Sequence, residues 1–244
     1  MGPHFSPGRN VLILMAASAL AASALAACAT LPSPQAARTA KPAQAYATAQ
    51  AFAGPAREWP ADDWWRAHPF SLSAAPNGRY LRFTVKALGD FSARLQALPC
   101  GVRVAIEGPY GNLTGAVRTR RRVLLVGGGI GVTPLRALLE ALPYEPGDLT
   151  LLFRASGERD LVFEAEIESI ARRRGAVVHY LVGPRGRRPA SDPLGPASIR
   201  RLVPDVAERD VYLCGPVPLM DMVGRGLRSL GVPDVRIHAE RFHQ

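Results

Sequence analysis

Apolar runs of strand length alternate with helix-length amphipathic segments through the second half of the chain. The expected strands are Arg122–Val126, Leu149–Phe153, Val177–Val182, Asp210–Cys214 and Val235–His238. The expected helices between them are Thr133–Glu140, Phe163–Arg173, Ala197–Leu202 and Pro218–Leu230. Strands that alternate with helices form a parallel sheet with helices on both faces. The pattern therefore predicts an α/β domain over residues 119–244.

A shorter region before this domain has the pattern of strands. Tyr80–Val85 and Val102–Ile106 alternate apolar and polar residues, and each follows a turn signal that contains glycine. Ser92–Leu98 lies between them and has the pattern of one short helix. A helix start can hold a phosphate, but Ser92 is more often an ordinary helix cap at such a position. We expect this second domain to cover residues 62–118.

Residues 1–61 differ in composition from the rest of the chain, with 20 Ala and a single acid, Glu58. A basic start, an apolar stretch and small residues before Cys28 describe a secretory signal, and Leu25–Cys28 resembles a lipoprotein lipobox. An Ala-rich leader or a marginal membrane helix is the alternative. Residues 31–60 have linker composition without apolar periodicity. We expect this leader and linker to supply no strands.

The composition excludes several classes of protein. The chain is 48% hydrophobic and 20% charged, which suits a packed core and excludes a disordered chain. Three Cys cannot form a disulfide framework, a four-thiolate zinc site or a four-thiolate iron–sulfur cluster, and we expect no metal site. The net charge of +10 suits nucleic acid, an anionic membrane surface or a phosphorylated ligand. The Arg clusters 172–174 and 185–188 lack interleaved aromatics, so we expect no nucleic-acid site.

A glycine-rich loop joins the first strand of the α/β domain to its first helix. Thr133 is placed as the helix cap and Pro134 as the first helical residue. Glycine lets the backbone approach an anion, and the helix end supplies aligned N–H groups, so Gly128, Gly129 and Gly131 would help to cradle a phosphate. Pro134 stands where a strict dinucleotide fingerprint has its third glycine. The alternative is a tight turn without a ligand.

Three segments follow strand ends in this domain: the glycine loop, residues 154–159 and Cys214–Pro216. Ligands of such sheets bind at the carboxyl ends of the strands, so these segments should line one crevice. Arg154, Ser156 and Arg159 lie where the adenosine ribose of a dinucleotide would be. Guanidinium and hydroxyl groups suit a 2′-phosphate, which favours NADP over NAD. The alternative is a solvated Arg-rich loop.

His68–Ser73 places an aromatic residue between hydroxyl residues on an expected strand. Phe70 could offer a flat face, and its neighbours a hydrogen-bond partner, to a planar heterocycle. The alternative is that Phe70 and Leu72 belong to the core while Ser71 and Ser73 face water.

Taken in order, these motifs resemble the ferredoxin–NADP reductase superfamily over roughly residues 64–244, and within it the flavin domain of ferric reductases and NADPH oxidases. The matching motifs are His68–Ser71, Gly89–Ser92, Glu107–Gly111, Gly127–Pro134, Cys214–Pro216 and Glu240–Phe242. The resemblance implies an α/β nucleotide-binding domain preceded by an antiparallel β-barrel flavin domain. Only about half of a six-stranded barrel is recognisable, so we expect a partial barrel.

The resemblance also implies roles for single residues. Phe70 would pack on the isoalloxazine, Ser71 would hydrogen-bond near flavin N5, and Cys214 would border the nicotinamide. Ser71 and Cys214 are therefore the candidate catalytic positions. The remaining candidate cofactor-binding residues are His68, Pro69, Ser73, Lys86, Gly89 and Ser92 for FAD, Gly128, Gly129, Gly131, Thr133, Pro134, Gly215 and Pro216 for NADP, Arg154, Ser156 and Arg159 for its 2′-phosphate, and Phe242 over the flavin ring.

The implied activity is hydride transfer from NAD(P)H to FAD, followed by single-electron transfer to a ferric, haem or iron–sulfur acceptor. The acceptor partner would be a haem membrane protein, a ferric complex or a ferredoxin. Because NAD(P)H is a cytoplasmic cofactor, we expect a cytoplasmic or inner-face location, and the leader leaves membrane association open. One alternative is a non-catalytic nucleotide-binding remnant with a damaged barrel. Another is an exported lipoprotein with a binding role.

Overall fold

The computed structural model describes residues 12–17, 25–30, 46–54, 68–98, 103–184 and 192–241. The chain forms two compact units, each with its own sheet. Unit 1 comprises Met1–Leu72 and Pro76–Tyr110, and unit 2 comprises Ser73–Ala75 and Gly111–Gln244.

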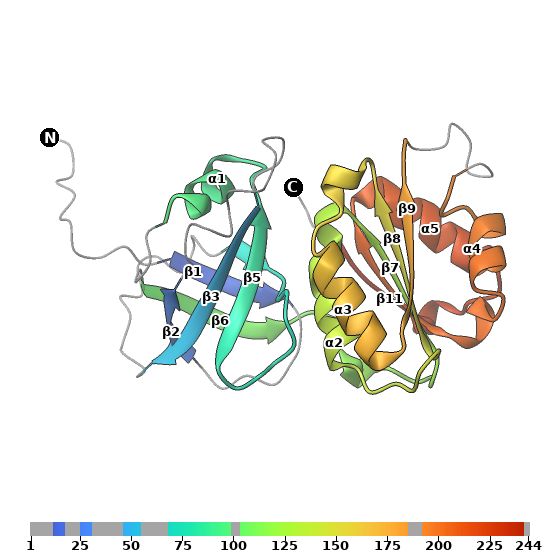
Figure 1. Ribbon diagram of the computed structural model, residues 1–244, viewed down its shortest axis with the longest axis horizontal. Helices are drawn as coiled ribbons and strands as arrows, with labels where there is room; N and C mark the ends of the chain where they lie inside the picture. Colours follow the sequence, from blue (N-terminus) through green and yellow to red (C-terminus); the bar gives the residue numbers. More distant parts are fainter. Residues whose placement is uncertain are drawn as a thin grey trace, which may run out of the picture. The chain divides into compact units, whose positions relative to one another are not determined.

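Unit 1 contains a six-stranded sheet in the order β4-β1-β6-β2-β3-β5 (Figure 1). Its elements are β1 (Leu12–Ala17), β2 (Leu25–Thr30), β3 (Tyr46–Gly54), β4 (His68–Phe70), β5 (Tyr80–Lys86), the short helix α1 (Asp90–Gln96) and β6 (Arg103–Tyr110). A bridge between Leu72, just after β4, and Phe83 of β5 joins the two outer strands of this order. The sheet is mixed rather than purely antiparallel, because β1 runs parallel to both β4 and β6.

The expectation that residues 1–61 supply no strands is wrong, because β1, β2 and β3 all lie there. The two-residue alternation of a β-strand is visible in β3, whose sequence Tyr46–Gly54 alternates alanine with larger residues. Because alanine, glutamine and threonine are common in linkers, composition alone concealed this strand. The segment Leu25–Cys28, interpreted as a lipobox, lies in β2 and pairs with both β3 and β6. The hypothesis of a non-catalytic remnant was based on an incomplete barrel. Because the sheet of unit 1 has six strands, that argument no longer holds.

Unit 2 confirms the expected α/β domain: its five strands are all parallel, in the order β11-β10-β7-β8-β9. The strands are β7 (Val123–Gly128), β8 (Leu149–Ala155), β9 (Val177–Val182), β10 (Asp210–Gly215) and β11 (Ile237–Arg241). The helices are α2 (Val132–Ala141), α3 (Glu164–Arg174), α4 (Pro196–Leu202) and α5 (Val217–Ser229). Helices α2 and α3 cover one face, and α4 and α5 cover the other (Figure 1). Among the helices that the structure describes, none is long and apolar enough to cross a membrane.

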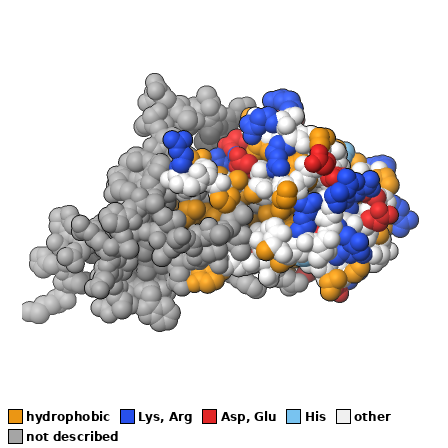
Figure 2. Space-filling view, turned by 90° about the horizontal axis from the view of Figure 1, so that it is seen from below, with side chains coloured by type: hydrophobic (Ala, Val, Ile, Leu, Met, Phe, Trp, Pro, Cys, Tyr) orange, Lys and Arg blue, Asp and Glu red, His pale blue; other side chains and the backbone are white. Residues whose placement is uncertain are grey.

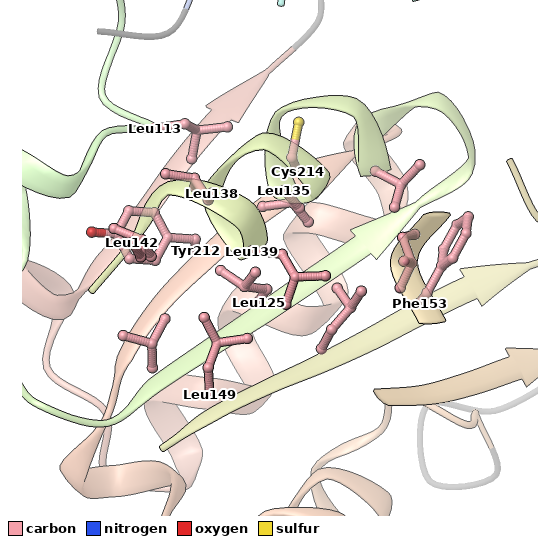
Figure 3. Packing of buried hydrophobic residues seen from close by; sticks show 14 of the residues in the cluster. Leu113, Leu125, Leu135, Leu138, Leu139, Leu142, Leu149, Phe153, Tyr212 and Cys214 are labelled. Atoms are coloured by element: carbon pink, nitrogen blue, oxygen red, sulfur yellow. The ribbon is translucent and has the colours of Figure 1, made fainter. Parts of the chain in front are cut away.

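Every residue of β7 and β8 is buried, because the sheet is covered on both faces. Val123 and Leu125 pack into one core with Leu135, Leu138 and Leu139 of α2 (Figure 3). The alternate positions of β7 pack into a second core beneath α4 and α5. These two cores hold the carboxyl ends of β7 and β10 in place.

Helix α2 begins slightly earlier than expected, at Val132 with Gly131 as its N-cap. Thr133 therefore lies inside the first turn, where its hydroxyl donates to the carbonyl oxygen of Ile130 at 2.9 Å. Pro134 also falls in the first turn, in which a missing backbone N–H costs the helix no hydrogen bond. The two residues still form the helix start, but each lies two positions further into the helix than the sequence predicts.

Candidate functional site

The glycine loop of unit 2 packs tightly against the end of β10. A Cβ on Gly131 would lie 2.5 Å from the carbonyl oxygen of Cys214. A Cβ on Gly128 would lie 2.8 Å from Cδ1 of Leu219 in α5. These contacts place the loop after β7 directly beside Cys214–Pro216, as the crevice prediction requires.

Gly129 differs from its neighbours because it borders open space. Its φ is +56°, a left-handed conformation that favours glycine, and a Cβ there would meet nothing within 4 Å. The 3-10 turn Gly129–Gly131 then leads into α2. Exposed backbone beside a helix amino end fits an anion such as a pyrophosphate.

Cys214 ends β10 with a fully buried thiol. Burial and then the carboxylate of Glu240 raise the pKa of this thiol. Glu240 lies opposite Cys214 in the register of β10 and β11. The thiol is therefore held neutral and serves as a small packing group with a weak S–H donor.

Glu240 lies with Cys214 at the carboxyl end of the sheet, although we did not predict it as a site residue. Its Oε1 accepts from the N–H groups of Asn112 and, at 3.2 Å, Leu113, while Oε2 is buried without a hydrogen-bond partner among the described residues. Burial raises the pKa of Glu240, and the two N–H donors only partly oppose it. Gly111, with φ +96°, makes room for this carboxyl, because a Cβ there would overlap Oε1. An acid at the carboxyl end of the last strand was the available signal.

Arg154 is not available for the role that the sequence predicts. Its side chain is 6% exposed, and its guanidinium donates to the carbonyl oxygens of Ala155, Leu181, Gly183 and Pro184. The last three of these bonds measure 2.7, 2.7 and 2.8 Å. Arg154 therefore ties β8 to the end of β9, and its donors are already used for that purpose.

Ser156 and Arg159 remain candidates for a 2′-phosphate. Both are exposed on the loop that follows β8, within or next to the short turn Glu158–Asp160. Glu158 is exposed in the same turn. An adenosine ribose at this strand end would therefore find a hydroxyl, a guanidinium and a carboxylate nearby.

In unit 1, β4 and the first turn of α1 meet through aromatic contacts. The rings of His68 and Phe91 are stacked, with centroids 3.5 Å apart and an interplanar angle of 21°. Burial and then the charge of Arg94 lower the pKa of His68, which favours a neutral imidazole. Phe70 lies 6.3 Å from Phe91 by ring centroid. His68 and Phe70 thus stand on the same side as the helix start that the resemblance assigns to the FAD pyrophosphate.

Ser71 is the feature of unit 1 that fits a flavin best. Its side chain is 6% exposed, so the alternative in which Ser71 and Ser73 face water is wrong. The Oγ of Ser71 is buried without a hydrogen-bond partner among the described residues. Phe70 beside it is half-buried against a small core that includes Leu72 and Phe83. A buried hydroxyl needs a partner, and a planar heterocycle with nitrogen and carbonyl groups would supply one.

Ser92 is committed to its own helix, as the helix-cap alternative states. Its Oγ accepts from the N–H groups of Leu88 at 2.9 Å and Gly89 at 3.0 Å, and donates to the carbonyl oxygen of Gly89. A phosphate at this helix would have to use backbone N–H groups instead of this hydroxyl. Of the other expected residues, Pro69 is exposed and Lys86 is half-buried at the end of β5.

Ser73 belongs to unit 2 rather than to the flavin strand. Its carbonyl oxygen accepts from Arg136 at 3.1 Å, and the N–H of Ala75 donates to Glu140 at 3.1 Å. Arg136 and Glu140 are ion-paired across one turn of α2, and we did not predict them. The Arg–Glu spacing of four residues just after the glycine loop was the available signal. Phe242 lies outside the described residues.

Comparison with known proteins finds this chain similar in sequence to known oxidoreductases. Residues 125–225 match the family model "Oxidoreductase NAD-binding domain". The reductase subunit of glycine betaine monooxygenase from Chromohalobacter salexigens is 29% identical over 71% of this chain and 50% of its own length. The flavohemoprotein of Vibrio cholerae is 30% identical over 71% of this chain and 45% of its own length. This chain therefore spans about half the length of the curated relatives it matches.

Solved structures show the same fold. The flavohem-like FAD/NAD binding domain of nitric oxide dioxygenase from Vibrio cholerae is 26% identical, with a TM-score of 0.58 over 71% of this chain and 76% of that domain. The ferredoxin reductase in carbazole 1,9a-dioxygenase is 22% identical, with a TM-score of 0.64 over 91% of this chain and 70% of that protein. The second match shows the fold alone, and it extends over the six-stranded unit as well.

Proposed function

Because this chain belongs to the ferredoxin–NADP reductase-like superfamily, we propose that it is an FAD-dependent NAD(P)H oxidoreductase which passes electrons to a haem or iron–sulfur acceptor. The observation that carries the proposal is the buried Oγ of Ser71, which has no hydrogen-bond partner among the described residues and lies next to the half-buried ring of Phe70. A buried hydroxyl without a hydrogen-bond partner lowers the stability of the fold, unless a ligand supplies that partner.

Each group of residues has a share in the proposed reaction. Phe70 packs against the isoalloxazine ring, and Ser71 donates to or accepts from its nitrogen edge. The backbone at Gly129 and the start of α2 hold the pyrophosphate of NAD(P)H. Cys214 and Glu240 would border the nicotinamide, where the thiol is buried and the carboxylate is half-buried. FAD, when bound, accepts a hydride and delivers electrons singly.

The acceptor is proposed from the chemistry of the relatives. One is the reductase subunit of a monooxygenase, and another is a flavohemoprotein by name. A haem or iron–sulfur protein therefore suits the electron-accepting role better than a ferric complex. The ferric reductase branch rests on the motif His68–Ser71 alone. The proposal includes a cytoplasmic or inner-face location, because NAD(P)H is made there.

Flavin content is the direct test of the proposed activity. The purified full chain is expected to show a flavin absorption band that NADPH or NADH bleaches without oxygen. Ser71→Ala is expected to slow this bleaching about tenfold, since one hydrogen bond is worth about 1.4 kcal/mol. Stopped-flow absorbance measures the rate. Ser198→Ala, a serine on α4, is the matched control and should leave the rate unchanged.

Two results would contradict the proposal. A colourless protein that still binds NADPH would favour a nucleotide-binding remnant. A flavoprotein whose Ser71→Ala variant is reduced at the normal rate would remove Ser71 from the reaction.

Preference for NADP is a separate part of the proposal. It now rests on Ser156 and Arg159, because Arg154 is committed to backbone carbonyl oxygens. Arg159→Gln is expected to weaken NADPH binding about tenfold relative to NADH, as one ionic hydrogen bond to the 2′-phosphate is lost. Arg154→Lys should lower the free energy of unfolding by about 2 kcal/mol without changing this ratio. Nucleotide titrations and thermal unfolding of both variants provide the check. If the ratio of NADPH affinity to NADH affinity is the same in Arg159→Gln and in the unaltered chain, the result would argue for NAD.

A further inference from the structure

A basic region lies at the amino ends of the unit 2 strands, at the end of the sheet opposite the glycine loop. It is a hollow of about 560 Å³ lined by Arg120, Arg121, Arg122, Ala207, Glu208 and Arg236. These residues come just before β7, β10 and β11, at the amino ends of the three strands. The hollow is therefore separate from the nucleotide site, which lies at the carboxyl ends. On the face of the described residues seen in Figure 2, basic side chains gather with acidic ones between them.

The backbone beside the hollow is held by Asp210, which is fully buried. This carboxylate accepts from the N–H of Thr119 at 2.6 Å, from the hydroxyl of Thr119 at 3.1 Å and from the N–H of Arg120. His238 stands at 3.3 Å from the same group. The start of the arginine run is thus fixed by a buried anchor, unlike the backbone of an ordinary solvated loop.

Two of the lining arginines are oriented by acids that lie outside the hollow's lining. Arg122 pairs with Asp205 at 2.8 Å, and Arg121 pairs with the buried Asp148 at 3.2 Å. The hydrogen bond from Arg122, together with one from Arg209, lowers the pKa of Asp205 although burial opposes the shift. Asp205 therefore stays ionised and keeps the guanidinium group of Arg122 in place at neutral pH.

The hollow retains uncompensated positive charge. The guanidinium of Arg120 makes no hydrogen bond or ion pair within the part of the chain that the structure describes, and it is exposed. Arg236 is half-buried and uses one nitrogen to donate to the carbonyl oxygen of Ala207 at 2.8 Å. Glu208 is the single acid among the lining residues. Because Arg121 and Arg122 are paired with Asp148 and Asp205, the excess is that of Arg120 and Arg236 over Glu208, and an anion would balance it.

We propose that this hollow binds an anion that carries two or more phosphoryl groups. Guanidinium groups match phosphate oxygens through paired hydrogen bonds, and two such groups, Arg120 and Arg236, have donors to offer. The volume is in the range of small-molecule sites, whereas an acidic polypeptide would need a larger contact surface. The same chemistry is found in free diphosphates and in phosphorylated lipid headgroups.

Isothermal titration of the full chain with inorganic diphosphate tests the proposal. NADP⁺ is present at saturation in a parallel titration, so that the glycine loop cannot account for the heat. Arg120→Gln and Arg236→Gln are each expected to weaken binding at least tenfold. Arg225→Gln removes the same charge from an exposed position on α5 and should change binding less than twofold. Binding should also weaken as salt is raised.

Vesicles distinguish the two sources of phosphate. Co-sedimentation with phosphatidylinositol phosphate vesicles that is lost in Arg120→Gln but kept in Arg225→Gln would assign the hollow to a headgroup. Diphosphate binding without vesicle binding would assign it to a free anion. The proposal is overturned if neither probe binds, or if Arg225→Gln weakens binding as much as Arg120→Gln. A flavin-free chain that still binds diphosphate here would leave this proposal standing while the proposed reductase activity failed.

Discussion

Replacing Gly131 by Ala is expected to lower the free energy of unfolding by about 3 kcal/mol and to abolish measurable NAD(P)H binding. The added Cβ would lie 2.5 Å from the carbonyl oxygen and 2.6 Å from the carbonyl carbon of Cys214. Both are backbone atoms of a buried central strand, so they cannot swing aside as a side-chain tip would. Either β10 or the loop must move, and the loop is the part that we propose to hold the pyrophosphate.

Gly157→Ala is the matched control for the effect of this substitution on stability. Its Cβ would meet nothing within 4 Å, and its φ of −155° is open to any residue. Chemical denaturation measures the stability of both variants, and fluorescence titration measures the binding of NADPH. Equal stability of the two variants would show that the loop and β10 are less tightly packed than the structure has them.

The second large effect is expected for Asp210→Ala, which should lower the free energy of unfolding by about 4 kcal/mol. Asp210 is 0% exposed and accepts from the N–H groups of Thr119 and Arg120, with the Thr119 hydroxyl and His238 also in reach. Alanine would leave these part-buried donors without their acceptor. It would also release the backbone of the arginine run, so diphosphate binding at the hollow should weaken in the same variant.

Two further variants separate the loss of the buried acceptor from the loss of an acidic side chain. Asp210→Asn keeps one acceptor oxygen and should cost less than Asp210→Ala. Asp234→Ala removes an exposed acid paired with Arg228 and should cost less than about 1 kcal/mol. Thermal unfolding of all three provides the measurement. A loss for Asp210→Ala no greater than that for Asp234→Ala would contradict the role of Asp210 as a buried anchor.

The α/β unit was predictable because its signals are local. Each strand of unit 2 is a short apolar run, each helix repeats its apolar positions every three to four residues, and the glycine loop stands between a strand and a helix. Such patterns are set by neighbours in the chain, so the order of elements and the crevice beside Cys214 follow from the sequence. The helix cap lies only two residues before the predicted position.

The candidate site was predictable only in part, because several groups depend on distant partners. Arg154 was expected to meet a ligand, yet carbonyl oxygens of Leu181 and Gly183 take its donors. Glu240 was missed because its partner, the N–H of Asn112, is 128 residues away in the chain. Arg136 was missed because the carbonyl of Ser73, which it binds, lies 63 residues earlier.

The sequence by itself determined the parallel sheet, the glycine loop and the order of the nucleotide motifs, since these depend on short-range periodicity and on the backbone freedom of glycine. Only the tertiary structure decided that the alanine-rich start supplies β1 to β3, because strand pairing joins residues that no local pattern connects. It also decided which polar groups are satisfied and which remain open. Arg154 is saturated by carbonyl oxygens, whereas Ser71 is buried with no hydrogen-bond partner in the described part of the chain, and that difference appears only when the chain is packed.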